Sequence, residues 1–277
     1  MGLVSSLGNI TQFRSNTPLT DDQIHRVAPS VYADAPHESR SERYQAIPTS
    51  VVLDALRNEG FYPFFAAQTA VRKESKREHT KHMLRLRHAS QINHKEANEI
   101  ILLNSHDGTS SYQMLAGMFR FVCANGMVCG NTVGDIRVRH QGKGDIVGDV
   151  IQGAYTVKEA FELIENERDT MRSVQVPPAA QVALAKTFLD YKHSDPMRPA
   201  PIEPEQLLRA RRHEDKGDDL WATTNRIQEN AMKGGLRGRN AKGRTTRTRE
   251  VKGIDNDVKL NKALWQMSLK MADILKG

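Results

Sequence analysis

The spacing of apolar and polar residues changes character near the middle of the chain. From about residue 64 to residue 140, apolar side chains alternate with polar ones or gather in short runs bounded by turn residues. Both patterns are typical of strands. The segment from His82 to His88 alternates, which places Arg85 and Arg87 on one face of a predicted strand. Because the predicted strands follow one another through short turns, we expect an antiparallel sheet.

Turn-forming residues divide this predicted sheet. A buried strand over Glu99–Leu103 runs into the dense turn sequence from Asn104 to Thr109. Gly117 is expected to interrupt the next strand, and Asn125-Gly126 is a strong hairpin-turn signal. A last alternating strand is predicted at Asp135–His140.

After residue 153 the apolar residues recur at helical spacing. Thr156 and Glu159 match a capping box at the start of a helix. Further helices are predicted from Pro177 to before Pro196, from about Asp218 to Met232, and from about Asn256 to Lys276. The sequence therefore predicts an α+β fold, in which an antiparallel sheet over residues 64–140 packs with C-terminal helices.

Composition divides the chain into a leader and one domain. Residues 1–42 are rich in Ser, Thr, Asn, Pro and Asp, which indicates a flexible leader with a short helix near Asp21–Val27. Residues 43–277 are expected to form a single α+β domain, whose C-terminal half, residues 156–277, is helical.

The same composition favours a cytoplasmic protein without a membrane anchor. No apolar run approaches the roughly 20 residues needed to cross a bilayer, and the N-terminus lacks the pattern of a secretory signal. The chain has 2 cysteines, Cys123 and Cys129, which is too few for a disulfide framework and suits a reducing compartment.

The net charge of +7 is concentrated in one segment, the basic arm (residues 233–252). The arm holds eight basic residues and one acid, Glu250, so it accounts for the whole excess. A neutral body with one basic arm predicts a polyanionic partner, which we take to be nucleic acid, and DNA rather than RNA. The alternative is a solvated loop, as most charge runs are. The predicted phosphate contacts are Arg237, Arg239, Lys242, Arg244, Arg247 and Arg249.

A second basic stretch lies in the predicted sheet. If Arg85 and Arg87 line an exposed face, Arg137 and Arg139 from the last strand would extend it into a groove with positive walls. Arg85 and Arg87 are therefore added to the predicted nucleic-acid contacts. The alternative is the ordinary polar face of a half-buried sheet.

The turn after the buried strand carries the only candidates for catalysis. His106 and Asp107 follow that strand directly, and a histidine such as His88 or His140 would have to join them to hold a metal or act as a base. Asp107-Gly108 is also ordinary chemistry for a tight turn, and the chain carries no metal-ligand spacing or nucleophile elbow. We therefore expect no metal and no cofactor, and an enzyme is not favoured.

Several motifs form recognisable sequence strings from about Tyr44 to the end of the chain. They are Ser41-Glu42-Arg43-Tyr44, Ile47-Pro48-Thr49, Asn104-Ser105-His106-Asp107-Gly108, Arg120-Phe121-Val122-Cys123-Ala124-Asn125-Gly126, Asn225-Arg226-Ile227-Gln228-Glu229-Asn230, Gly234-Gly235 and Leu260-Asn261-Lys262-Ala263-Leu264-Trp265. Together these motifs resemble the phage- and plasmid-borne family called domain of unknown function 932. The resemblance implies a mobile-element setting and assigns no catalytic residue.

The leading hypothesis is a nucleic-acid-binding protein of a mobile element that binds or anneals single-stranded DNA in recombination or replication. Annealing would require assembly into a homo-oligomer. One alternative is a metal-assisted enzyme acting on nucleic acid near His106 and Asp107. The other is an anti-defence protein whose partner is a host protein.

Overall fold

The computed structural model of the 277-residue chain describes residues 3–6, 10–35, 37–38, 48–69, 74–91, 96–120, 125–129, 136–138 and 145–277. Two compact units are present, residues 1–161 and residues 162–277. The first holds a sheet with helices and the second is mainly helical, so the α+β fold class is confirmed. Whether residues 43–277 fold as one domain stays a prediction.

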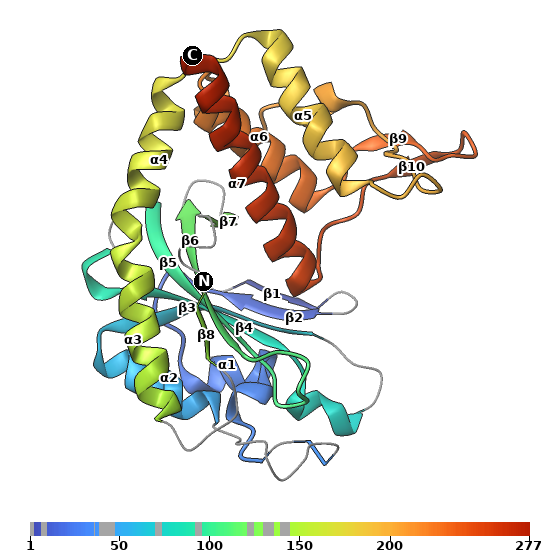
Figure 1. The fold of residues 1–277 in the computed structure, drawn as a ribbon. Coiled ribbons are helices and arrows are strands. Elements are labelled where there is room, and N and C mark those ends of the chain that lie inside the picture. The colour runs from blue at the N-terminus through green and yellow to red at the C-terminus, as the bar shows by residue number, and fades with distance from the viewer. Residues whose placement is uncertain are drawn as a thin grey trace. The chain divides into compact units, whose positions relative to one another are not determined.

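The first unit is built on an eight-stranded antiparallel sheet (Figure 1). Strands β1 to β7 pair in chain order, and β8 joins the sheet beside β6. The strands are β1 (Leu3–Ser6), β2 (Ile10–Arg14), β3 (Phe61–Thr69), β4 (His82–His88), β5 (Glu96–Asn104), β6 (Tyr112–Arg120), β7 (Asn125–Val128) and β8 (Ile136–Val138).

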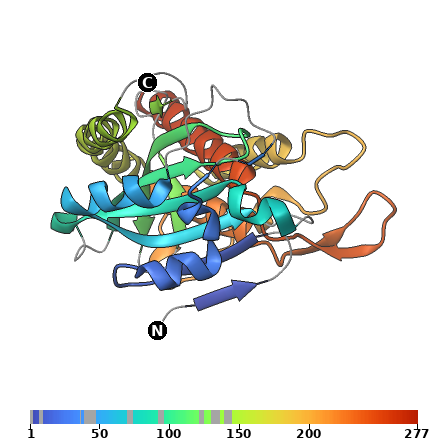
Figure 2. The same cartoon turned by 90° about the horizontal axis from the view of Figure 1, so that it is seen from below.

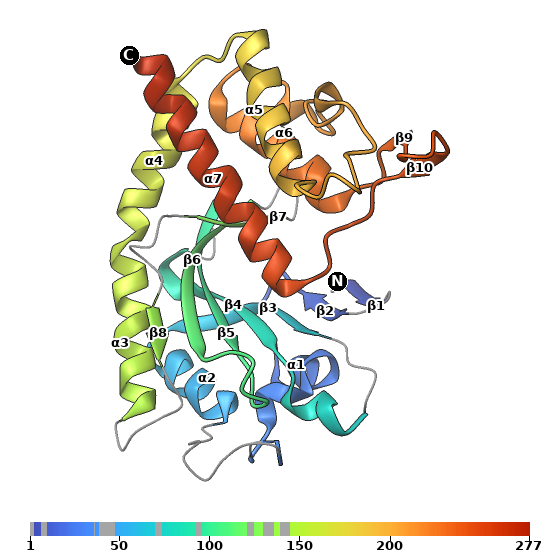
Figure 3. The same cartoon turned by 45° about the vertical axis from the view of Figure 1, so that its right-hand side comes forward.

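In the described part of this unit, three α-helices pack on the sheet: α1 (Asp21–Val27), α2 (Thr49–Asn58) and α3 (Ile146–Glu159). Helices α1 and α2 contact β3, whereas α3 contacts β5, β6 and β8 (Figure 3). Their apolar faces are fully buried at residues such as Ile24, Leu53 and Val150. Burial of this kind stabilises the fold by roughly 1.5–3 kcal/mol per large side chain. Short 3₁₀ turns occur at Pro29–Tyr32, Glu74–His79 and Ala89–Gln91.

The predicted flexible leader is wrong for the residues that the structure describes. Strand β2 pairs with β3 along its whole length. Helix α1 lies where the sequence predicts it, and a capping box formed by Thr20 and Gln23 opens it. Ile24 and Val31 are fully buried. The few apolar residues of this segment are spaced to face the core, so its polar composition did not prevent packing.

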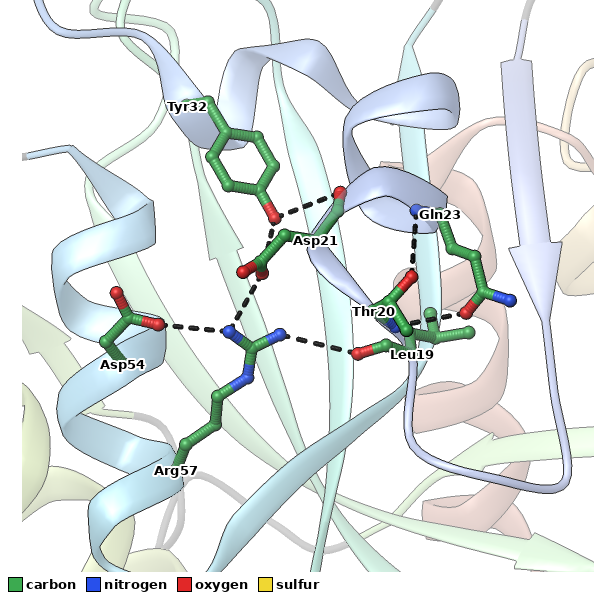
Figure 4. Close-up of polar contacts among 7 residues, drawn as sticks. All are labelled: Leu19, Thr20, Asp21, Gln23, Tyr32, Asp54 and Arg57. Atoms are coloured by element: carbon green, nitrogen blue, oxygen red, sulfur yellow. Dashed lines mark hydrogen bonds and ion pairs between the residues drawn. The ribbon is translucent and has the colours of Figure 1, made fainter.

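Arg57 of α2 ties this segment to the body of the unit (Figure 4). Its guanidinium lies 2.8 Å from the carboxylate of Asp21 and 3.0 Å from that of Asp54, and it donates to the carbonyl of Leu19. The hydroxyl of Tyr32 donates to Asp21 at 2.9 Å. Burial and the bond to Asp21 raise the pKa of Tyr32, so this hydroxyl stays a donor throughout the physiological range.

Two turn predictions are also corrected. Gly117 lies within one continuous strand, β6, where it pairs with Glu99 and Val128. Asn125-Gly126 lies in β7, paired with Arg120 and Phe119, rather than in the turn. Tertiary pairing overrides the local turn preference at both sites.

The helical half begins earlier than its periodicity suggests. Helix α3 starts at Ile146, where the Asp145 carboxylate accepts from the backbone N–H of Gly148 at 2.9 Å. Thr156 and Glu159, the predicted capping box, lie at the end of this helix. A single aspartate cap has no characteristic sequence pattern. Gly148 and Gly153, which lie within the helix, weaken its helical pattern further, so the sequence did not reveal the start of α3.

The second unit contains α4 (Phe161–Ser173, which begins at the boundary), α5 (Pro178–Lys192), α6 (Leu220–Lys233), α7 (Ile254–Lys276) and two short strands, β9 (Arg237–Arg239) and β10 (Thr245–Arg247). The rings of Trp221 and Trp265 pack edge-to-face with their centroids 6.0 Å apart, and the Trp265 indole N–H donates to the Glu167 carboxylate at 2.8 Å. The predicted starts and ends of α6 and α7 are confirmed within two residues, and α5 starts at the predicted prolines and ends at Lys192, before Pro196 as expected. Short 3₁₀ turns occur at Pro204–Gln206 and His213–Asp215.

No helix in the described part of the chain has both the length and the apolar character needed to cross a membrane.

Candidate nucleic-acid interface

The basic arm folds as a β-hairpin. Strands β9 and β10 pair antiparallel, and the hairpin extends away from the helices of its unit (Figure 2). Asn240 organises the turn, because its side-chain oxygen accepts from the backbone N–H groups of Lys242 and Arg244, each at 3.0 Å. Gly243 has a φ of +73°, a backbone conformation that glycine adopts without strain. We call this element, residues 237–249, the basic hairpin.

The pleat of the hairpin sorts its side chains onto two faces. Arg237, Arg239 and Arg247 are exposed on one face, which we call the arginine face. Gly238 and Thr246, which alternate with them, are partly covered on the other. The register places Arg247 directly opposite Arg237. Of the other predicted contacts, Lys242 and Arg244 lie exposed in the turn, and Arg249 is exposed two residues beyond β10.

The less exposed face of the hairpin rests on the proline-rich segment before α6. The backbone N–H of Arg239 donates to the carbonyl of Pro201 at 2.8 Å. A Cβ at Gly238 would lie 1.7 Å from the Pro201 carbonyl oxygen, so only glycine allows this approach. Gln206 donates to the carbonyl of Arg237 at 2.9 Å. The arginine face therefore points away from its own support.

The base of the arm is held by polar residues of α6, which belong to the Asn225–Asn230 motif. Asn230 accepts from Arg211 at 2.7 Å, and Arg211 also donates to the carbonyl of Gly234 at 2.6 Å. The buried Glu229 receives Arg212 and Lys233, each at 2.8 Å. Burial tends to raise the pKa of Glu229, but these two cations outweigh it and hold the pKa below its ordinary value. Glu229 and Asn230 of the motif thus anchor the base of the arm.

A pocket of about 570 Å³ lies beside the hairpin, and the sequence did not reveal it. The end of α5, the segment after it and strand β10 with its flanks form the walls. The prolines of the segment after α5, at positions 196, 199, 201 and 204, are by themselves typical of a linker. The lining residues are Lys192, His193, Met197, Arg198, Pro199, Pro201, Asn240, Ala241, Lys242, Thr246, Arg247, Thr248 and Arg249.

Lys192 is a partly buried cation in the wall of this pocket. Its ammonium group donates to the carbonyl of Ala231, and burial lowers its pKa from 10.5 to about 8. Burial also lowers the pKa of the neighbouring His193, with the charge of Lys192 adding to the effect. Burial makes the charged form of Lys192 unfavourable, and an anion bound in the pocket would offset that cost.

Arg85 and Arg87 do not line an exposed face, and their assignment as nucleic-acid contacts is corrected. Their side chains are 3% and 0% exposed, and both reach the fully buried carboxylate of Glu99, at 3.4 Å and 2.9 Å. The guanidinium of Arg87 also lies over the rings of Phe64 and Phe119. Both faces of this strand are buried, and on one of them Arg85 and Arg87 are paired with Glu99 inside the protein. The expected extension by Arg137 and Arg139 stays a prediction, since Arg139 lies outside the described residues.

His106 and Asp107 point into different surroundings. Asp107 closes its own turn, accepting from the backbone N–H and the hydroxyl of Thr109 at 3.0 Å and 2.6 Å. Burial alone would raise the pKa of Asp107, but these hydrogen bonds outweigh it, so the pKa lies below its ordinary value. The carboxylate is thus occupied as an acceptor within the turn.

His106 is fully buried in a polar network around Thr49. The Thr49 hydroxyl contacts the Nε2 atoms of His106 and His82 at 3.4 Å and 3.0 Å, and the Asn104 side chain donates to it at 3.0 Å. His88, at the opposite end of β4, bonds instead to Ser90, and His140 lies outside the described residues. Within the residues that the structure describes, no three His, Cys, Asp or Glu side chains converge as metal ligands would.

Comparison with known proteins agrees with the motifs. The model of the family described as Domain of unknown function (DUF932) matches residues 36–265. Two Escherichia coli (strain K12) proteins, UPF0380 protein YfjQ and UPF0380 protein YafZ, are each 56% identical to the chain over 266 residues, which is 96% of each chain. No solved structure matches the chain significantly.

Proposed function

Because the chain belongs to the Domain of unknown function (DUF932) family, whose name assigns no activity, we propose from the basic hairpin itself that the protein binds nucleic acid. The observation that carries the proposal is the arginine face. Arg237 and Arg247 are exposed and directly opposite one another. Like charges in this position destabilise a hairpin unless an anion lies between them. A phosphate backbone would supply that anion.

The ligand class follows from the shape and chemistry of the hairpin. Arginine guanidinium groups form bidentate hydrogen bonds with phosphate, and phosphate contacts carry no sequence information. The hairpin has no recognition helix and presents arginines along a narrow ribbon. We therefore propose sequence-independent binding of single-stranded DNA, serving recombination or replication of a mobile element. Annealing of two strands would require a homo-oligomer.

The experiment is a salt series with a fluorescent single-stranded oligonucleotide, read by anisotropy. Six phosphate contacts predict that log K falls with log salt at a slope of about −4. Replacing Arg237, Arg239 and Arg247 with alanine should reduce the slope by about 2 and weaken binding at low salt. A slope near zero for the unaltered protein would contradict the proposal.

A matched control separates local contacts from net charge. The exposed lysines Lys216, Lys270 and Lys276 lie in the same unit and outside the hairpin. Their replacement by alanine lowers the net charge by the same amount and should leave the slope within experimental error. Equal effects of the two triple variants would mean that the arginine face is not the binding site.

The two alternatives have their own readouts. Metal analysis of the purified protein, together with nuclease activity of a His106→Ala variant, tests the metal-assisted enzyme. An anti-defence role predicts that a host protein stays bound to the chain after nuclease treatment, and that this partner is lost when the arginine face is removed.

A further inference from the structure

The pocket beside the hairpin combines apolar walls with a cationic rim. Met197, whose side chain is 84% exposed, Pro199, Pro201 and Ala241 contribute apolar surface. Five cationic side chains line the same space, and none of its lining residues is an acid. A volume of about 570 Å³ falls in the range of roughly 300–1,000 Å³ in which proteins bury small organic ligands. These properties suit a ligand with a flat apolar part and a negative charge beside it.

The pocket is continuous with the arginine face. Thr246, Arg247, Thr248 and Arg249 are consecutive along β10 and its flank, and all four line the pocket. Arg247 therefore belongs both to the arginine face and to the pocket wall. A nucleic-acid strand whose phosphates contact the arginine face would pass the mouth of the pocket without turning away from the hairpin.

Resting on the function proposed above, we infer that this pocket receives one unpaired base of a bound strand, so that the protein prefers single-stranded to double-stranded DNA. The base would lie against Met197 and the prolines, and the adjoining phosphate would lie among Arg247, Arg249 and Lys192. In a duplex the bases are paired and stacked, and bringing one out costs a few kcal/mol. A single strand presents its bases at no such cost.

Charge alone does not explain the features of this pocket. An exposed methionine beside two prolines adds nothing to phosphate binding, whereas apolar residues gathered in one place, as Met197, Pro199 and Pro201 are here, mark contact surfaces. Arg198 lies on the rim with its side chain 88% exposed, and its guanidinium forms a long ion pair of 3.8 Å with Asp195. A pair this exposed contributes little and leaves the guanidinium available to stack on a base.

The test compares three DNA ligands of equal length: a single-stranded oligothymidine, the same strand made entirely of abasic sites, and a duplex. The abasic strand keeps the phosphates and removes the bases. For the unaltered protein, we expect the oligothymidine to bind about tenfold more tightly than either other ligand, the order of magnitude of one stacked base. The double variant Met197→Ser and Pro199→Ser removes apolar wall without changing charge.

That double variant should lose most of the preference for the base-bearing strand, while its affinity for the abasic strand stays within twofold of the unaltered protein. The control variant, Leu163→Ser with Ile274→Ser, removes two exposed apolar side chains elsewhere in the unit, which are 50% and 64% exposed. It should keep the full preference. Because all four positions are exposed, both variants are expected to fold normally.

The outcomes distinguish this inference from the proposed function. Salt-dependent binding of equal strength to the oligothymidine and the abasic strand would overturn the pocket assignment and leave phosphate binding by the hairpin intact. A preference for bases that survives in the double variant would overturn it as well. Absence of binding to all three ligands would refute the proposed function, and the pocket assignment with it.

Discussion

Arg237 and Arg247 face each other across the β9–β10 ladder, both exposed and on the same face of the hairpin. Two like charges in register weaken a strand pair by roughly 0.2–1 kcal/mol. The protein retains this pair in the segment that carries its whole excess of charge. Together with the proposed function, this relationship predicts that stability and binding move in opposite directions when one partner is removed.

The first prediction concerns this pair. Replacing Arg247 with threonine, a residue that favours strands, should raise thermal stability slightly or leave it unchanged, because the repulsion across the ladder disappears. The same change should weaken single-strand binding and reduce the salt slope by about 0.7, as expected for one lost phosphate contact. Thermal unfolding and the anisotropy salt series measure the two effects. A variant that is less stable and binds normally would assign Arg247 a structural role.

The second prediction concerns the support of the hairpin. Gly238→Ala places a methyl group where the Pro201 carbonyl oxygen lies, so the hairpin must shift or detach. We expect a lower melting temperature and weaker binding to single strands, although no charge is removed. Gly243→Ala is the matched control, because no atom lies within 4 Å of its added Cβ. Its positive φ should cost only about 1 kcal/mol, and binding should be retained. Equal binding by both variants would show that the hairpin acts without its contact to Pro201.

The third prediction tests the corrected role of Arg87. Arg87→Met leaves the buried Glu99 with a weaker partner, Arg85, at 3.4 Å. Breaking a buried ion pair in this way costs about 3–5 kcal/mol in free energy of unfolding. Denaturant unfolding should report this loss, while the variant that remains folded binds DNA with unchanged affinity. Lys186→Met, which removes an exposed pair with Asp190, should cost less than about 1 kcal/mol. Loss of DNA binding by a folded Arg87→Met variant would show that Arg87 does belong to the nucleic-acid interface.

The fourth prediction concerns Lys192, whose pKa burial lowers to about 8. Between about pH 8 and the ordinary lysine pKa of 10.5, the unfolded chain holds a proton that the folded protein has released. Unfolding therefore takes up a proton, and the contribution of Lys192 makes the free energy of unfolding increase with pH across this interval. Below about pH 8 the contribution is constant, because both states are protonated.

Denaturant unfolding at pH 7, 8, 9 and 10 measures the effect, with Lys192→Met as the comparison. The difference in free energy of unfolding between the variant and the unaltered protein should be largest at pH 7 and shrink as the pH rises. The exposed Lys186, replaced in the same way, provides the control and should show a constant difference. A constant difference for Lys192→Met as well would mean that its ammonium is solvated in the folded protein.

The elements with strong local signals were predictable from the sequence. Helix α5 begins at consecutive prolines, α6 ends at paired glycines, and α1 lies at its predicted bounds. Proline and glycine restrict or free the backbone itself, so their effect does not depend on the rest of the fold. The antiparallel sheet was also predictable, because the alternation of apolar and polar residues and the short turns between strands are local features of the sequence.

The environment of single side chains was not predictable. The alternation through Arg85 and Arg87 places them on one face of β4, but it does not reveal Glu99 on the neighbouring strand, which pairs with both. Gly117 and Asn125-Gly126 read as turns, and strand pairing draws them into β6 and β7. For the two arginines and Gly117 the decisive partner is Glu99 on another strand, whereas Asn125-Gly126 pairs with the nearby Arg120 and Phe119.

The basic arm shows the same division between local and tertiary information. The sequence by itself determined how much charge the arm carries and that helices bound it, since both properties are local. Only the tertiary structure decided that the arm is a hairpin, that Arg237 lies opposite Arg247, and that a pocket opens beside it. The reason is physical: the register arises from the pairing of β9 with β10, the pocket walls come from α5, the Pro201 segment and β10, and no single segment encodes either arrangement.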